Sequence, residues 1–542
     1  MTAPTMPAPA PPRPLQPGQP TRPLGPGRPR RRWWPRWLHW PQWDASVWRR
    51  VGASFASGLL LAAAYPPLDL GPLALVALVP LLWAWRDATP RRAALYGFWF
   101  GVAFFGVLLS WIWYFGAVAF VPLVVAGGWY VAAPGALVAV FARYGLRSPW
   151  LTAALWVMFE QLRDRFPFGG LPWGETGAAL HDVPVARSLA SWGGVALVTF
   201  LVVAVNGLLV DALAATRARS WNGMAAAAGL AVVVALTGFS DAFRFQPTED
   251  GRPLRIATIQ GNDQNRDITD PAEFERVVVE AHFRLAEEEL EGDYDLIVFP
   301  ESSLNRNPTD DQELRQRLLD IGAAHDSAML VNALLPAPDA RDFNTNLLFD
   351  RDGDLQGKYA KQRLVPFGEY VPYRDQLDFL GALDQIPYDY AHGPGRRLFE
   401  VSGRRMATII CFESAFGPLV RDFVRDGAEF VIVSTNNRSY RRSGNAAQHL
   451  ALSQMRAAET GRPFIHASIS GISGIIDPDG DVHDTTDLFV NEVVTAEITP
   501  TTGQTPYVRY GDSLIWGCGL ALVALALLAR LRRTATPPSR AP

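Results

Sequence analysis

The chain has very little cysteine, few charged residues and no excess of either charge. Cys411 and Cys518 are its only two cysteines, and Cys518 lies in a distant apolar run, so we expect no disulfide between them. Charged residues make up 19% of the 542 residues, and 50 basic and 53 acidic side chains leave a formal net charge of −3. This balance does not indicate a nucleic-acid partner, whereas the low charge content and 18 tryptophans indicate contact with lipid.

Apolar runs long enough to cross a bilayer recur along the chain. We expect eight spans, at residues 48–66, 70–86, 93–115, 119–142, 149–162, 188–212, 221–240 and 512–530. The fifth run is short and continues into the Gly- and Pro-rich stretch 168–173, which allows a broken or re-entrant segment. Every second loop between the spans contains basic residues. Arg163 and Arg165 in the fifth loop are exceptions to this alternation. The positive-inside rule then puts both termini in the cytoplasm and residues 241–511 on the outer face.

The composition changes at a few places, and these set the expected domain boundaries. Residues 1–45 are rich in Pro and Arg and predict a disordered cytoplasmic tail. Residues 46–241 hold the first seven spans, 511–530 hold the last, and 531–542 form a second cytoplasmic tail. Residues 245–505 alternate strand-like with helical patterns, which predicts an α/β domain on the outer face.

The strand-like runs of this domain are rich in β-branched residues, and the helical patterns lie between them. The expected strands include 254–259, 295–299, 329–334, 405–410, 430–434 and 464–468. The expected helices are 272–290, 311–325 and 446–460.

Three strand-like runs end beside side chains that can do chemistry. Glu301 follows one run directly after Pro300, Lys361 follows another, and Cys411 ends a third where a helix can begin. A helix N-terminus stabilises a thiolate, and its free N–H groups can hold an oxyanion. Each signal is weak alone, because a single Glu or Lys is more often a surface charge and a single Cys a small buried apolar residue.

The order Glu, Lys, Cys, each after an apolar strand, resembles the nitrilase superfamily. Together with the apolar spans, the chain resembles the apolipoprotein N-acyltransferase family. The matching stretches are 260–262, 300–302, 364–372, 411–413, 456–463 and 470–473, with 168–173 and 192–194 in the apolar part. The resemblance implies a multi-pass α-helical membrane domain joined to an α/β nitrilase-like four-layer sandwich, in the inner or plasma membrane.

The resemblance also implies a covalent two-step reaction that needs no cofactor and no metal. Cys411 would attack an acyl ester of a phospholipid and form a thioester. The α-amine of a diacylglyceryl-modified cysteine at a lipoprotein N-terminus would then accept the acyl group. Glu301 would act as the base, and Lys361 would supply positive charge for the thiolate and the oxyanion.

Further residues of the matching stretches are expected to assist. Glu369 would orient Lys361 or help proton transfer, Glu413 would shape the pocket, and Phe412 is a further supporting residue. The expected substrate contacts are Gln260, Asn262 and Arg438.

The chain departs from the pattern of the family at four places. No Trp lies near Arg266, Phe412 replaces a common Tyr, His466 replaces a common Arg, and stretch 436–442 is different. These departures bear on lipid selectivity and acceptor binding.

Two other functions remain open from the sequence. A membrane-bound nitrilase-type amidase or acyltransferase could use the same three residues with water or another amine as acceptor, and the membrane spans favour lipid substrates over these. A membrane scaffold without catalysis is the second alternative. Transporters tend to place charged groups inside their spans, and these spans contain very few.

Overall fold

The computed structural model describes residues 44–218, 229, 244–249, 251–263, 270–304, 306–377, 379, 381, 383, 386 and 388–535. The chain divides into two compact units, Met1–Ala45 and Ser46–Pro542, and the second contains almost everything described below. The predicted N-terminal tail up to residue 43 and nearly all of the predicted span 221–240 lie outside the described residues.

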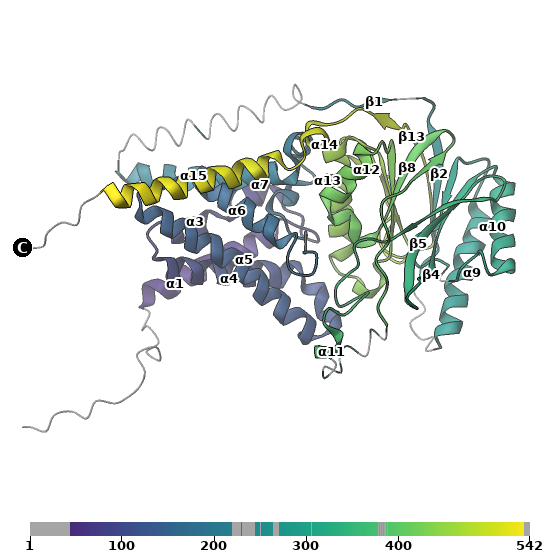
Figure 1. Ribbon diagram of the computed structural model, residues 1–542, viewed down its shortest axis with the longest axis horizontal. Coiled ribbons are helices and arrows are strands. Elements are labelled where there is room, and N and C mark those ends of the chain that lie inside the picture. The colour runs from purple at the N-terminus through teal and green to yellow at the C-terminus, as the bar shows by residue number, and fades with distance from the viewer. Residues whose placement is uncertain are drawn as a thin grey trace, which may run out of the picture. The chain divides into compact units, whose positions relative to one another are not determined.

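Apolar helices form the part of the chain that precedes the sheets (Figure 1). They are α1 (Ala45–Ala62), α2 (Ala74–Ala77), α3 (Val79–Trp85), α4 (Pro90–Leu108), α5 (Ala117–Arg143), α6 (Pro149–Arg163) and α7 (Pro184–Ala218). Short 3-10 helices between them are η2 (Gly71–Leu73), η3 (Ser110–Phe115) and η4 (Thr176–Leu180).

Two of the predicted spans are interrupted where the sequence contains Pro or Gly. The predicted span 70–86 is divided into η2, α2 and α3, because Pro72 and Pro80 lack the N–H that a continuous helix needs and instead begin new turns. Helix α7 is broken at Gly193 and Gly194, and Gly194 has φ +70°, which a residue with a side chain adopts only with strain.

Three helices of the described part are long and apolar enough to cross a membrane. They are Ala117–Arg143, Pro184–Ala215 and Ser513–Leu531, the last within α15 (Ser513–Ala535). Trp516, Leu520, Val523 and Leu527 are exposed along α15. A helix that shows large apolar side chains over its length suits contact with lipid tails rather than water.

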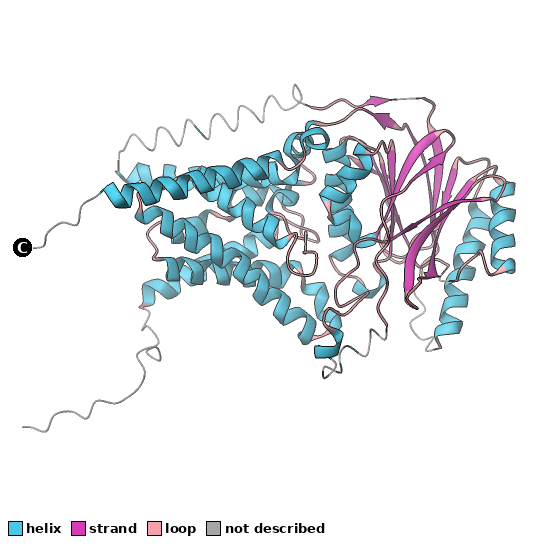
Figure 2. Cartoon of the chain, viewed as in Figure 1, coloured by secondary structure: helices cyan, strands magenta, loops and turns pink. Residues whose placement is uncertain are grey.

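Two six-stranded mixed sheets form the α/β part (Figure 2). The first has the order β13-β2-β3-β4-β5-β6, with β2 (Leu254–Gln260), β3 (Leu296–Val298), β4 (Ala328–Pro336), β5 (Asp342–Phe349), β6 (Leu355–Ala360) and β13 (Glu492–Ile498). The second has the order β12-β11-β10-β9-β8-β7, with β7 (Leu398–Val401), β8 (Arg404–Ile410), β9 (Phe430–Thr435), β10 (Phe464–Ser468), β11 (Gly474–Ile476) and β12 (Val482–His483). A short pair joins β1 (Thr248–Glu249) to β14 (Thr501–Thr502).

The centre of each sheet is parallel. Strands β2, β3 and β4 run the same way, as do β8, β9 and β10. These strands are buried almost throughout, as parallel strands covered on both faces must be. Residues that follow parallel strands meet at one edge of a sheet, which is where α/β proteins place functional groups.

Helices cover both sheets. Helices α9 (Pro271–Glu289) and α10 (Gln312–Ala324) pack on the first sheet, and α12 (Gly417–Arg425) and α13 (Asn445–Thr460) pack on the second. Helix α13 also contacts α7 and η4, so it lies between the second sheet and the apolar helices (Figure 1). The remaining short helices are α11 (Arg374–Leu377), η7 (Cys411–Ala415), η8 (Arg438–Tyr440) and α14 (Pro506–Tyr510).

Candidate active site

Glu301 and Lys361 meet at the edge of the first sheet. Glu301 comes shortly after β3, and Lys361 directly follows β6. Lys361 Nζ lies 3.2 Å from Glu301 Oε1 and 2.8 Å from Glu369 Oε1, and the Lys361 side chain is only 1% exposed. The amide of Asn344 donates to Glu301 Oε1 at 2.7 Å.

The charges of this group follow from its burial. Burial raises the pKa of Glu301 above its usual value, although the ammonium of Lys361 opposes the shift. Burial alone would lower the pKa of Lys361, but the carboxylates of Glu301 and Glu369 outweigh it and hold that pKa well above the usual range. Lys361 therefore stays an ammonium at neutral pH.

Cys411 lies at the sharp turn where β8 ends and is the first residue of η7. Its φ of +52° is in the left-handed region, which a residue with a side chain seldom adopts, and its side chain is buried. Burial and then the charge of Glu301 raise the pKa of the Cys411 thiol to about 12, against the opposing effects of Lys361 and the Thr435 hydroxyl. The thiol is thus protonated at neutral pH and needs a base before it can attack.

Glu413 ties the end of β6 to the turn at Cys411. Four groups donate to its carboxylate oxygens at distances from 2.7 to 3.0 Å: the backbone N–H groups of Gln362, Arg363 and Ile410 and the hydroxyl of Tyr359. Gln362 is next to Lys361, and Ile410 is next to Cys411. A single buried carboxylate therefore ties the backbone next to Lys361 to the backbone next to Cys411.

Comparison with known proteins places the chain in a family. Residues 57–208 match the apolipoprotein N-acyltransferase N-terminal domain, and residues 255–507 match the carbon-nitrogen hydrolase domain. The chain is 30% identical over 502 residues to the apolipoprotein N-acyltransferase of Geobacter metallireducens, covering 88% of this chain and 95% of that relative. It is 31% identical over 511 residues to that of Methylococcus capsulatus, covering 89% and 96%. The chain belongs to the apolipoprotein N-acyltransferase family.

Membership of the apolipoprotein N-acyltransferase family confirms the predicted resemblance. The chain is a membrane protein and an acyltransferase with a carbon-nitrogen hydrolase domain. Solved structures that resemble it include an amidase from Nesterenkonia sp., 18% identical, with a TM-score of 0.34 and coverage of 49% of this chain and 96% of the amidase. Saccharomyces cerevisiae Nit3 is 16% identical, with a TM-score of 0.35 and coverage of 47% and 93%.

Buried asparagines in the first sheet were not predicted as part of the site. Asn332 in β4 donates to Asn344 Oδ1 at 2.8 Å and to Asn346 Oδ1 at 2.9 Å, both in β5. Asn346 in turn donates to the hydroxyl of Thr408 in β8 at 2.6 Å, which joins the two sheets. Their signal in the sequence is the presence of asparagine inside strands, where it is uncommon.

The amides of Gln260 and Asn262 are used inside the protein. Gln260 is fully buried and accepts from the hydroxyls of Ser473 and Thr486 at 2.6 and 3.0 Å. Asn262, with φ +66°, donates to the carbonyl of Phe489 at 3.1 Å. Both hold the chain around residues 470–491 in place, and substrate contact stays a prediction for them.

Arg438 contacts an acidic side chain. Its Nε lies 3.3 Å from Oδ2 of Asp263, whose side chain is 2% exposed, and its guanidinium lies 3.8 Å from the centre of the Phe274 ring. Substrate contact by Arg438 also stays a prediction, and Asp263 already neutralises part of its charge.

Phe412, the residue after Cys411, packs edge-on against Phe416, with 5.0 Å between the ring centres.

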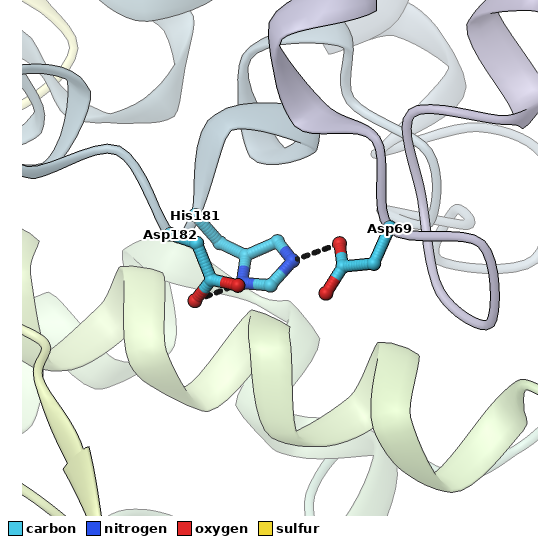
Figure 3. Close-up of side chains that lie close together, drawn as sticks. All are labelled: Asp69, His181 and Asp182. Atoms are coloured by element: carbon cyan, nitrogen blue, oxygen red, sulfur yellow. Dashed lines mark hydrogen bonds and ion pairs between the residues drawn. The ribbon is translucent and has the colours of Figure 1, made fainter.

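A second cluster of charged groups lies between the apolar helices and α13. His181 lies between Asp69 and Asp182 (Figure 3), with Nε2 2.9 Å from Asp69 Oδ1 and Nδ1 3.2 Å from Asp182 Oδ1. Gln454 Oε1 of α13 lies 2.7 Å from the same Nδ1. Burial would lower the pKa of His181, but hydrogen bonds with Asp182 and Asp69 raise it to about 9. The three residues are close enough to suggest a metal site, but an imidazolium with both nitrogens donating suits an ion-pair clamp.

Proposed function

We propose that the chain moves an acyl group from a phospholipid, through a thioester on Cys411, to the N-terminal amine of a diacylglyceryl-modified lipoprotein. The observation that carries this proposal is the buried Glu301–Lys361 pair, whose charges act on the buried thiol of Cys411. The names of the relatives, which are apolipoprotein N-acyltransferases, support the lipoprotein as acceptor.

The first half-reaction forms the thioester. Glu301 takes the thiol proton, and the thiolate attacks the carbonyl carbon of the phospholipid ester. The ammonium of Lys361 and backbone N–H groups at the start of η7 stabilise the oxyanion that develops. The C–O bond to glycerol then breaks, and Glu301 returns the proton to the glycerol oxygen, so that a lysophospholipid leaves.

The second half-reaction repeats these steps with an amine. The lipoprotein α-amine attacks the thioester carbonyl, and the C–S bond breaks after a second oxyanion has formed. Glu301 takes a proton from the amine nitrogen and transfers it to the departing sulfur of Cys411. Lys361 keeps its proton throughout, because its pKa is held far above neutrality.

Glu369 and Glu413 act as supporting residues in this scheme. Glu369 Oε2 accepts the N–H of Val365 at 2.8 Å, which fixes the carboxylate that contacts Lys361. Glu413 fixes the turn at Cys411 through its four hydrogen bonds. Neither side chain needs to exchange a proton for this role.

Exposed aromatic rings near the site support a lipid substrate. Phe168 of the apolar part lies 5.9 Å from Phe367 and 6.2 Å from Tyr373, between ring centres. All three rings are exposed, and the last two follow Lys361 within the stretch 364–373. A cluster of exposed rings at the boundary with apolar helices suits acyl chains more than a soluble substrate.

The proposed organisation in the membrane follows the sequence. About eight spans lie in residues 46–241 and 511–530, and the four-layer catalytic domain, 245–505, faces the outer side of the inner or plasma membrane. Residues 1–45 and 531–542 are then cytoplasmic tails. The basic loops support this orientation, since positive residues stay on the cytoplasmic side.

The test is an assay with both substrates. Purified full-length protein in phospholipid vesicles receives a diacylglyceryl lipopeptide with a free N-terminus, and mass spectrometry follows the N-acyl peptide and the peptide that contains Cys411. We expect an acyl adduct on Cys411 that hydroxylamine removes, and N-acyl peptide as product. Cys411→Ala should abolish both, whereas Cys518→Ala should leave both.

Two outcomes would overturn the proposal. Free fatty acid without N-acyl peptide would favour a membrane-bound amidase or hydrolase of the same superfamily. Full activity of Cys411→Ala would remove the thioester from the mechanism.

A further inference from the structure

The backbone carbonyl of Cys411 is held by a buried histidine that no catalytic role explains. His449 Nε2 in α13 lies 3.0 Å from the Cys411 carbonyl oxygen and 2.8 Å from the hydroxyl of Ser414. On the other side of the ring, Nδ1 lies 3.3 Å from the Thr435 hydroxyl and 3.2 Å from Nδ2 of Asn437. His449 therefore contacts the turn that contains Cys411 through Nε2, and the end of β9 with the residues after it through Nδ1.

These partners determine the tautomer of His449. A carbonyl oxygen only accepts, so Nε2 must carry the hydrogen. The amide nitrogen of Asn437 only donates, so Nδ1 must be the acceptor. A neutral ring meets both demands, and burial lowers the pKa of His449 to about 4.

The hydrogen bond from His449 to the Cys411 carbonyl also orients the N–H group of Phe412. The peptide between Cys411 and Phe412 is planar, so fixing its C=O also fixes the direction of the Phe412 N–H. That N–H belongs to the start of η7, where the oxyanion of the proposed reaction is stabilised. His449 is thus placed to orient a donor of the oxyanion site without touching substrate.

The residue before His449 contacts the apolar helices instead. Gln448 Oε1 accepts from the indole N–H groups of Trp111 at 3.1 Å and Trp173 at 2.8 Å. Its Nε2 donates to the carbonyls of Pro66 at 2.9 Å and Leu108 at 3.2 Å. Indoles only donate and carbonyls only accept, so these four bonds use the whole amide in one orientation.

Consecutive residues on a helix point about 100° apart. Gln448 can therefore contact the ends of three apolar segments while His449 contacts the turn at Cys411. The Trp173 ring also lies 5.8 Å from the His449 ring, between centres, and 5.4 Å from that of Trp111. A displacement of either tryptophan would therefore change the surroundings of both Gln448 and His449.

We propose that Gln448 and His449 form a positioning pair that couples the apolar helices to the nucleophile. His449 sets the peptide group of Cys411, and Gln448 sets His449 according to the positions of Trp111 and Trp173. The pair makes the reactivity of Cys411 depend on the packing of η3 and the stretch 168–173. This inference rests on the proposed role of Cys411.

The test uses full-length protein in phospholipid vesicles without any acceptor, so that only thioester formation is measured. The rate constant for the acyl adduct on Cys411, its dependence on phospholipid concentration and the melting temperature are determined for each variant. His449→Phe keeps a ring but loses both nitrogens, while His449→Gln keeps a donor that reaches the Cys411 carbonyl. Gln448→Met removes all four bonds to the apolar part at nearly constant volume.

Gln454→Met is the matched control. Gln454 lies on the same helix and also bonds to the apolar part, through His181 and Asp182, but does not neighbour the turn at Cys411. We expect it to lower the melting temperature while leaving the rate constant unchanged.

For His449→Phe we expect a rate constant about 10- to 100-fold lower at an unchanged half-saturating phospholipid concentration, since a misdirected donor loses part of what an oxyanion donor contributes. His449→Gln should recover most of this loss, and Gln448→Met should slow the step in the same direction. A wild-type rate in His449→Phe or Gln448→Met would overturn the positioning role, and so would equal losses in His449→Phe and His449→Gln. If the wild-type protein forms no thioester, the proposed function itself has failed.

Discussion

Glu301 and Lys361 follow strands that are not neighbours, yet their charged groups lie 3.2 Å apart. Strands β4 and β5 separate β3 from β6 in the first sheet. The side chains bridge this gap over Asn344 of β5, which donates to Glu301 and whose carbonyl accepts the Lys361 N–H at 2.9 Å. The pair is thereby fixed before any substrate arrives, as electrostatic catalysis requires.

Replacing Glu301 by Gln should remove the base and nearly stop thioester formation. We expect a loss of about 10²- to 10⁴-fold, the usual contribution of general base catalysis. In the wild type, only the deprotonated carboxyl works, so the rate should fall as the pH falls through the pKa of Glu301. Burial raises that pKa, so the acid limb should lie above the usual value for glutamic acid, about 4.3.

Single-turnover rates between pH 4 and 9 would check this. The Glu301→Gln variant should lose the acid limb along with the rate. An unchanged limb in the variant would assign the titration to another group.

Replacing Lys361 by Met should cost stability in addition to slowing thioester formation. The variant leaves the buried carboxylates of Glu301 and Glu369 without their ammonium, and breaking a buried ion pair in this way costs about 3–5 kcal/mol. Protonation relieves an unpaired buried carboxylate, so the deficit should be smaller at low pH. Chemical unfolding in detergent at several pH values measures it, with the exposed Lys358 of the same strand replaced by Met as control.

The sequence predicted the strands that precede Glu301 and Cys411, but not the polar network around them. The strand-like run 405–410 and the helical pattern 446–460 nearly coincide with β8 and α13, because apolar runs and helical periodicity are local properties. Strand β5 was missed, since Asn344 and Asn346 break its apolar pattern. These asparagines are explained only by partners in other strands, which a local pattern does not contain.

Helix α13 shows the same limit more clearly. Gln448, Gln454 and Glu459 give it the composition of a helix with a solvated face, yet the structure buries that face against the apolar helices. The apolar spans were also predicted from local hydropathy. Hydropathy does not reveal the breaks at Pro72 and Pro80, which arise because proline lacks the backbone N–H of a continuous helix. Tertiary burial and backbone geometry are the parts that a one-dimensional pattern leaves out.

Replacing Arg438 by Ala should lower stability rather than change lipid preference. Arg438 forms an ion pair with the buried Asp263 and lies over the Phe274 ring, so its loss weakens the charge compensation of a buried carboxylate and removes a ring contact. We expect a loss of about 1–3 kcal/mol in unfolding free energy, since Arg438 itself is half-buried and solvent replaces part of the interaction. Adding Asp263→Asn should restore part of that loss.

Acyl-transfer rates on anionic and zwitterionic phospholipids complete this test. Their ratio should be the same in Arg438→Ala as in the wild type. A ratio that shifts toward zwitterionic donors would instead support the substrate contact that the sequence predicted for Arg438.

The His181 clamp should make stability depend on pH above neutrality. The pKa of His181 is raised to about 9 in the folded protein, against about 6.5 for a free histidine. A group with a raised folded pKa stabilises fully below its unfolded pKa and loses that effect as the pH rises through the folded value. The contribution of the clamp should therefore be constant below about pH 6.5 and disappear as the pH passes 9.

Melting temperatures of the wild type and His181→Gln between pH 5.5 and 10 measure this contribution as a difference. The difference should be largest at the acid end and shrink across the window from about 6.5 to 9. His483→Gln provides the control, because His483 pairs with Asp477 at 2.8 Å on the surface, where ion pairs contribute little. A difference for His181→Gln that stays constant across the window would mean that the ring is neutral in the folded protein and donates to only one of the two carboxylates, which would overturn the ion-pair clamp.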